Sequence, residues 1–231
     1  MNMKRIFSII VATVFVALSP RIGRADSFDV SLNTSPLSGS TQILAFGLND
    51  SDGSSNTISL SGFSFGGGSA IFGPGSPDCT LGGALSGVGC SGNLTSGVTL
   101  SDATTTEVFF DQEFNVGSSL SFEMTTTNNF AGSIPDGFAM YLCNSTLTDC
   151  YSDDPSGSGA MLILGLAGTP LAPSSFDLYT ASAEELPAPV VTTTSAGSSN
   201  VPEPPAVLLL GFGVLALVRQ IQLGSQRGRD A

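Results

Sequence analysis

Apolar residues recur at every second position through most of the chain, from Asp26 to about Thr180. Side chains of a β-strand point alternately to its two faces, so this period of two predicts strands with one buried and one solvated face. No window of the same stretch has the 3.6-residue periodicity of an amphipathic helix. The clearest alternations are Phe28/Val30/Leu32, Leu44/Phe46/Leu48, Ile58/Leu60, Leu120/Phe122/Met124, Phe138/Met140/Leu142 and Phe176/Leu178.

Turn-forming residues separate these runs. The breaks are Asp52-Gly53, Gly66-Gly67-Gly68, Gly73-Pro74-Gly75, Asp136-Gly137 and Asp153-Asp154-Pro155, and further strand-like segments cover 94–100, 106–114 and 159–166. Short strands with such breaks predict an all-β domain over residues 26–180, built as an antiparallel β-sandwich or jelly roll. The chain has no Trp and three Tyr, so we expect its core to consist of Phe, Leu, Ile and Val.

Charge is distributed very unevenly along the chain. Between residues 26 and 218 there is no Lys, Arg or His, and this stretch carries 18 of the 19 carboxylates. Nucleic-acid binding, which needs basic side chains, is therefore excluded, as are catalysis by a His-activated nucleophile and phosphate binding by Lys or Arg. The carboxylates, among them Asp29, Asp111 and Glu123, are expected on solvent faces, where they favour solubility; a Ca²⁺ role is the alternative.

The N-terminal residues have the features of a secretory signal peptide. Lys4 and Arg5 precede an apolar run over 6–18, and the small residues Gly23 and Ala25 stand before Asp26. We therefore assign residues 1–25 to a signal peptide that signal peptidase cleaves between Ala25 and Asp26.

The C-terminal region changes in composition after the predicted domain. Residues 181–200 are rich in Ser, Thr and Pro and are expected to form an extended linker. An uncharged apolar run over 206–218 follows, and Arg219 comes directly after it. Thirteen helical residues span about 20 Å of a roughly 30 Å hydrocarbon core, and a snorkelling Arg219 extends that span. The sequence predicts a short transmembrane helix with its basic end in the cytoplasm.

The motif Val201-Pro202-Glu203-Pro204, the apolar segment and the basic end occur in that order over residues 201–231. This region resembles the PEP-CTERM sorting signal of Gram-negative bacteria. The resemblance implies that an exosortase, a membrane transpeptidase, recognises the Pro-Glu-Pro motif and processes the tail. It also implies an inner-membrane-anchored intermediate, delivery to the cell surface or extracellular matrix, and a setting of exopolysaccharide and biofilm production.

The four cysteines are expected to form disulfides, because an even number in an exported chain favours pairing. Cys79 with Cys90 and Cys143 with Cys150 would each close a short loop beside turn residues, and the two other pairings remain open. A zinc site is not expected, since no Cys-x₂-Cys element is present.

Three features are candidates for a binding or catalytic site. Residues 134–142 resemble the Asp-Gly-Phe-Ala-Phe strand start of legume-type lectins, which implies sugar contact by Asp136 beside Gly137. Asn49-Asp50-Ser51-Asp52-Gly53 lacks the ligands that an EF-hand needs at positions 48 and 59, so a hairpin turn is expected there and no metal site is assigned. Four carboxylates could supply a glycosidase pair, although sugar-binding Trp is missing: Glu107, Asp111, Glu113 and Glu123.

These patterns together predict a non-enzymatic exported surface or matrix protein with no cofactor. The alternative is a lectin-like carbohydrate-binding module, with Ca²⁺ as a possible cofactor and exopolysaccharide as a possible partner. A carboxylate-based glycan-acting enzyme is the third hypothesis.

Overall fold

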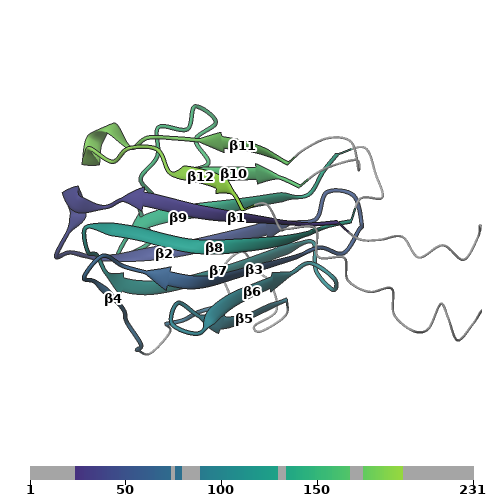
Figure 1. The fold of residues 1–231 in the computed structure, drawn as a ribbon, viewed down its shortest axis with the longest axis horizontal. Coiled ribbons are helices and arrows are strands. Elements are labelled where there is room, and N and C mark those ends of the chain that lie inside the picture. Colours follow the sequence, from purple (N-terminus) through teal and green to yellow (C-terminus); the bar gives the residue numbers. More distant parts are fainter. Residues whose placement is uncertain (1–23, 74–75, 80–88, 130–133, 167–173, 195–231) are drawn as a thin grey trace, which may run out of the picture. The chain divides into compact units, whose positions relative to one another are not determined.

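The computed structural model describes residues 24–73, 76–79, 89–129, 134–166 and 174–194. Within them the chain is all-β, with twelve strands in two six-stranded antiparallel sheets and two short 3₁₀ helices (Figure 1). The predicted β-sandwich is confirmed at this level. Most of the predicted signal peptide and the whole of the predicted sorting tail lie outside the described residues.

The first sheet has the strand order β12-β1-β8-β3-β6-β5. Its strands are β12 (Val190–Thr193), β1 (Arg24–Asn33), β8 (Ser119–Asn128), β3 (Thr57–Ser64), β6 (Gly97–Ser101) and β5 (Cys90–Asn93). The longest pairing runs between β1 and β8, from Arg24 opposite Asn128 to Asn33 opposite Ser119.

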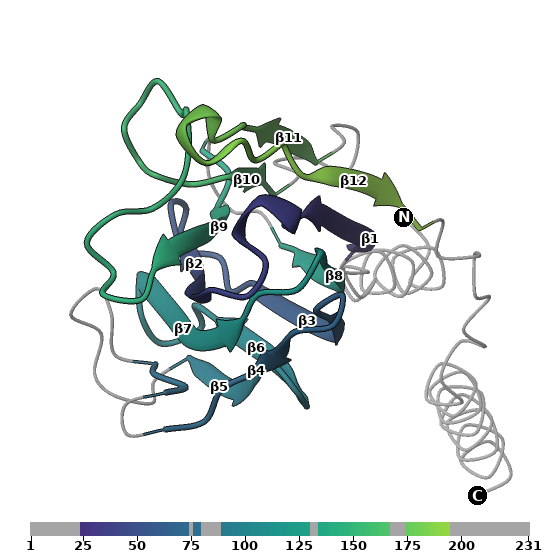
Figure 2. The ribbon, with the colours of Figure 1, turned by 90° about the vertical axis from the view of Figure 1, so that its left-hand side faces the viewer.

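The second sheet has the order β11-β10-β9-β2-β7-β4. Its strands are β11 (Ser175–Leu178), β10 (Leu162–Gly165), β9 (Gly137–Asn144), β2 (Thr41–Asn49), β7 (Glu107–Asn115) and β4 (Ser69–Ala70). The 3₁₀ helices η1 (Ser35–Leu37) and η2 (Ser182–Glu184) lie in connections. Figure 2 views the sandwich from one end, with β12 beside β1 and β11 beside β10.

The core lies between the sheets, and Phe46 of β2 is at its centre. This side chain is fully buried, and its ring contacts the rings of Phe63, Phe110, Phe122 and Phe138 with centroids 5.7 to 6.1 Å apart. Aromatic pairs at such distances stabilise a core beyond the area that they bury. The expected core of Phe and aliphatic residues is therefore confirmed.

Two predicted strands differ in detail from the observed ones. Segment 94–100 is interrupted, because the turn between β5 and β6 occupies its first residues. Asn93 Oδ1 accepts hydrogen bonds from the backbone N–H groups of Thr95 and Ser96, and this Asx turn ends β5 before Leu94. At the edge strand β11, Leu178 is 36% exposed instead of buried, since an edge strand lacks a neighbour on one side.

The predicted linker boundary at residue 181 is wrong. Ala181 and Leu186 are 1% and 2% exposed and belong to the core, and β12 pairs with β1 from Phe28 opposite Thr193 to Ser31 opposite Val190. The compact unit extends to Thr194. A segment rich in Ser, Thr and Pro can form an edge strand and the loop that leads to it as readily as an extended linker. Composition alone does not distinguish these two structures.

Candidate site at the inter-sheet loops

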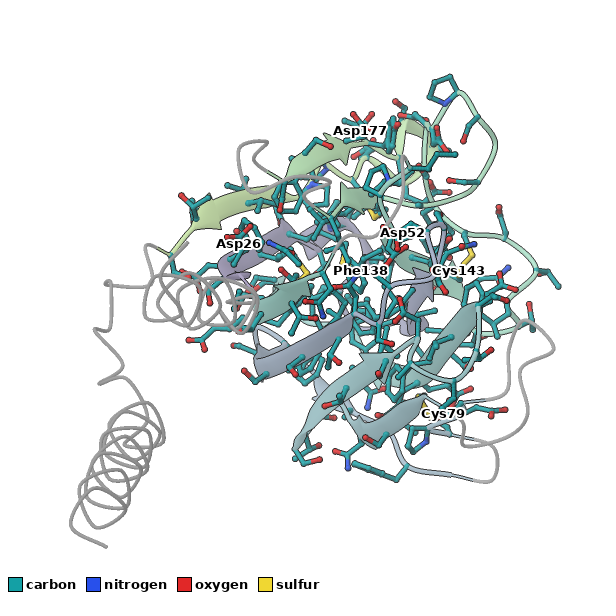
Figure 3. All side chains as sticks on the ribbon, turned by 90° about the vertical axis from the view of Figure 1, so that its right-hand side faces the viewer. Asp26, Asp52, Cys79, Phe138, Cys143 and Asp177 are labelled. Carbon is teal, nitrogen blue, oxygen red and sulfur yellow. A yellow bond between two sulfur atoms is a disulfide. The ribbon has the colours of Figure 1, made fainter. Side chains whose placement is uncertain are left out.

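Three connections between the two sheets lie at one end of the sandwich. β2 leads to β3 through residues 50–56, β6 leads to β7 through 102–106, and β8 leads to β9 through 129–136. Asn49 at the end of β2 lies opposite both Glu107 and Gly137, the first residues of β7 and β9. Residues that are far apart in sequence therefore meet at this end, which Figure 3 views with Asp52 labelled.

The first connection is organised by its own carboxylates. Asp50 Oδ1 accepts hydrogen bonds from the backbone N–H groups of Asp52 and Gly53 at 3.0 and 2.6 Å, and Asp52 Oδ1 accepts one from Ser54 at 2.7 Å. Gly53 has a φ of +77°, which favours glycine. The predicted turn is present, but it crosses from one sheet to the other, so the expectation of a hairpin is wrong.

The carboxylate of Asp136 accepts hydrogen bonds from residues of the first connection, 50–56. Its side chain is 2% exposed, Oδ1 accepts the Ser51 backbone N–H at 2.7 Å, and Oδ2 accepts the Asn56 side-chain N–H at 2.6 Å. Burial raises the pKa of Asp136 although these hydrogen bonds oppose the rise. Both carboxylate oxygens thus have partners within the protein, and sugar contact by Asp136 and Gly137 stays a prediction.

Asn56 is the polar centre of this end, and sequence reasoning missed it. The side chain is 1% exposed; its Nδ2 donates to Asp136 Oδ2 and the Asn129 carbonyl, while its Oδ1 accepts from the Asn129 backbone N–H and the Thr127 hydroxyl. A buried amide with this many partners fixes the two loops relative to each other. A single Asn in a Ser-rich segment gives no sequence signal for such a role.

Asp102 is a fourth carboxylate at this end, and it too was missed. It is 4% exposed, Oδ1 accepts the Asn56 backbone N–H at 2.5 Å, and Oδ2 is buried with no hydrogen-bond partner. Burial raises the pKa of Asp102 to about 6, and the negative charges of Asp136 and Asp50 add to the rise.

The carboxylates of Asp50, Asp52 and Asp136 form a cluster in which one oxygen of each lies within 4.8 Å of the others. Oxygen atoms at this spacing can share one cation. We call Asp50, Asp52 and Asp136 the loop carboxylate cluster.

The four carboxylates considered for glycoside hydrolysis do not form one group. Glu107, Asp111 and Glu113 are on β7 of one sheet, whereas Glu123 is on the exposed face of β8 in the other. Phe110 precedes Asp111 and Phe122 precedes Glu123, and both Phe side chains point into the core. Because successive residues of a strand point to opposite faces, Asp111 and Glu123 lie on the two outer faces of the sandwich.

Asp29, Asp111 and Glu123 were expected on solvent faces, and for Asp111 this expectation is wrong. Asp111 is 6% exposed because the segment after β4 pairs with β7 here: the backbones of Asp78 and Asp111 exchange two hydrogen bonds of 2.8 and 2.9 Å. Burial, together with the charges of Asp78 and Glu113, raises the pKa of Asp111 to about 6. Asp29 and Glu123 are exposed as expected.

Both local disulfides are present, as Cys79–Cys90 and Cys143–Cys150, with sequence separations of 11 and 7 residues. Two disulfides indicate an oxidising compartment such as the extracellular space. None of the described residues forms a helix long and apolar enough to cross a membrane. The sorting motif Val201-Pro202-Glu203-Pro204 and segment 206–218 lie outside those residues.

Comparison of the chain with protein-family models, with curated proteins and with solved structures gives no significant match.

Proposed function

We propose that this chain is a non-enzymatic exported protein of a Gram-negative bacterium, which an exosortase sorts to the cell surface or extracellular matrix. The observation that carries the proposal is the order of three elements along the chain. A signal-peptide pattern ends at Ala25, a disulfide-containing domain follows, and Val201-Pro202-Glu203-Pro204 precedes an apolar segment and Arg219.

The path of the chain through the domain supports a tethered arrangement. β12 is antiparallel to β1, and the Thr194 backbone N–H donates to the Ser27 carbonyl at 3.1 Å. The start of β1 and the end of β12 therefore lie side by side at the end of the sandwich that holds the loop carboxylate cluster.

Processing at the predicted signal site is compatible with this fold. Cleavage before Asp26 removes Arg24 and Ala25 from the start of β1 and leaves the pairs from Asp26 opposite Thr126 to Asn33 opposite Ser119. Asp26 Oδ2 accepts hydrogen bonds from Asn128 at 2.7 Å and Ser174 at 3.0 Å. The new N-terminal residue is thus held within the sheet.

Substitution of the motif tests the proposal. Glu203→Ala should leave an unprocessed protein in the inner-membrane fraction, whereas the wild type reaches the surface or medium. Glu185→Ala is the matched control, because it removes one carboxylate outside the motif. Equal distribution of Glu203→Ala and wild type between the fractions would contradict sorting by this motif.

A further inference from the structure

The outer faces of the two sheets differ in composition. Outward positions are those that alternate with core residues along a strand. In the first sheet they hold hydroxyls and carboxylates: Ser27, Asp29 and Ser31 of β1, and Ser121, Glu123 and Thr125 of β8. In the second sheet many of them are apolar or aromatic: Ala45 and Gly47 of β2, Phe109 of β7, Ala139 and Tyr141 of β9, and Ile163 of β10. An antiparallel sheet with one solvated face normally has polar residues on that face, so the second sheet departs from the pattern that the first one follows.

Phe109 and Tyr141 meet over β2, which lies between β7 and β9 (Figure 2). Gly47 is opposite Phe109, and Ala45 is opposite Tyr141. A Cβ atom at Gly47 would lie 3.0 Å from Phe109 Cε1, so the Phe109 ring lies over Gly47. The two ring centroids are 6.5 Å apart, and both side chains are half-buried, which leaves part of each ring accessible. We call Phe109 and Tyr141 the outer aromatic pair.

Carboxylates lie beside the outer aromatic pair. Glu107 and Glu113 are half-buried and share the outer face of β7 with Phe109. Burial raises the pKa of Tyr141, and the negative charges of Glu107 and Asp154 add to the rise, so both carboxylates lie near its hydroxyl. Ionised carboxylates accept hydrogen bonds and donate none. A ligand of this face must therefore donate hydrogen bonds and offer apolar surface to the rings.

The charges of this face decide between possible occupants. Residues 26–218 contain no Lys, Arg or His that could offset the carboxylates. A second copy of the same face would bring Glu107 and Glu113 of both copies together, and an anionic polymer would add further negative charge, so both occupants are repelled. A neutral sugar meets the requirements. Its hydroxyls can donate to carboxylates, and its apolar C–H faces can pack on aromatic rings.

We propose that the outer face of the second sheet binds a neutral polysaccharide, with the outer aromatic pair stacking on sugar rings and Glu107 and Glu113 accepting hydrogen bonds from sugar hydroxyls. This site is distinct from Asp136, which lies in the inter-sheet loops. The proposal adds a ligand class to a surface or matrix protein, but it does not depend on exosortase sorting.

Four substitutions separate ring stacking, hydrogen bonding and folding. Phe109→Leu and Tyr141→Leu remove a ring but keep an apolar side chain over β2, whereas Tyr141→Phe keeps the ring and removes only the hydroxyl. Glu107→Gln removes a charged acceptor from the proposed site. Its matched control is Glu123→Gln, because Glu123 is exposed on the outer face of the other sheet.

The experiment measures depletion of the purified full-length protein from solution by insoluble polysaccharides. The neutral probes are cellulose, curdlan, mannan and chitin, and the charged probes are cationic chitosan and anionic alginate beads. We expect the wild type to bind at least one neutral probe equally at about 0.05 and 0.5 M NaCl, since binding of an uncharged ligand is not screened by salt. It should not bind alginate.

On the neutral probe, Phe109→Leu and Tyr141→Leu should each weaken binding by about tenfold, as expected for the loss of one stacking ring. Tyr141→Phe should weaken it less than Tyr141→Leu does, Glu107→Gln should weaken it severalfold, and Glu123→Gln should bind like the wild type. Thermal unfolding of each variant checks that it is folded, and Tyr141→Phe and Glu107→Gln keep the test decisive if a Leu variant is not.

The proposal is overturned if the wild type binds none of the neutral probes. It is also overturned if the folded ring variants bind like the wild type. Retention by chitosan alone that disappears at 0.5 M NaCl would replace the neutral polysaccharide with a cationic partner, such as a basic protein segment, and would equally overturn it.

Discussion

Asn56 donates a 2.6 Å hydrogen bond to Asp136, and this bond joins two buried side chains that are 80 residues apart in sequence. Asn56 precedes β3 of one sheet and Asp136 precedes β9 of the other. The bond therefore holds the two sheets together at the end where the carboxylates gather.

Replacement of Asn56 by Ala should destabilise the domain by about 3 kcal/mol, because Asp136 Oδ2 and the Asn129 backbone N–H would each lose a partner. Denaturant unfolding measures this change in the free energy of unfolding. Asn115→Ala is the control: Asn115 is exposed, and its loss should cost less than about 0.5 kcal/mol. Similar values for the two variants would show that Asn56 has no central role.

Stability should increase as the pH falls from 7 to 5. The pKa values of Asp102 and Asp111 are raised to about 6 in the folded domain, above the value of about 3.9 in an unfolded chain. A raised folded pKa gives stability that is complete below the unfolded pKa and is lost as the pH rises through 6. Each residue should contribute about 1 kcal/mol between pH 7 and 5, so the Tm in EDTA should be on the order of 5 °C higher at pH 5.

The variants Asp102→Asn and Asp111→Asn separate the two contributions to this pH dependence. Each should flatten the Tm profile between pH 5 and 7 by about half, and the double variant should remove most of it. A wild-type Tm that falls steadily from pH 7 to 5 would contradict the assignment of these two carboxyl groups as buried.

Replacement of Leu186 by Ala tests the revised domain boundary. Leu186 is 2% exposed and belongs to the core, so the substitution should cost about 2–3 kcal/mol in denaturant unfolding. Val190 is 59% exposed in the nearby strand β12, and Val190→Ala should change stability by less than about 0.5 kcal/mol. A neutral Leu186→Ala would restore the interpretation of 181–194 as a linker.

Removal of the first disulfide should lower the free energy of unfolding by about 3 kcal/mol. Cys79–Cys90 spans 11 residues, and loop-closure entropy for a loop of this length gives a value of that size. The Cys79→Ala/Cys90→Ala protein is compared with the wild type in denaturant, and non-reducing peptide mapping checks the pairing. A mapped peptide that joins Cys79 to Cys143 or Cys150 would contradict the structure.

The sequence predicted the parts of the fold that depend on local patterns. Alternation identified the buried faces of β1, β2, β8 and β9, whose inward residues include Phe28, Phe46, Phe122 and Phe138. Short spacing and turn residues identified both disulfides. These features depend on neighbours in sequence, and the period of a strand is unaffected by which strand pairs with it.

The contacts and the burial that the sequence did not predict depend on the order of the strands in the two sheets. Asp50 and Asp136 come together only because β2 lies beside β9, and no local pattern indicates that pairing. Asp111 appeared solvated because alternation cannot show that Asp78 pairs beside it. Asn56 and Asp102 were overlooked for the same reason, since their burial comes from connections that cross between the sheets.

The most direct test of exosortase sorting is mass spectrometry of both termini of the native protein, in cells with and without the exosortase. We predict a first residue of Asp26 in both strains and a C-terminal end near Glu203 only where the exosortase is present. An end at Ala231 in both strains would contradict the proposed sorting.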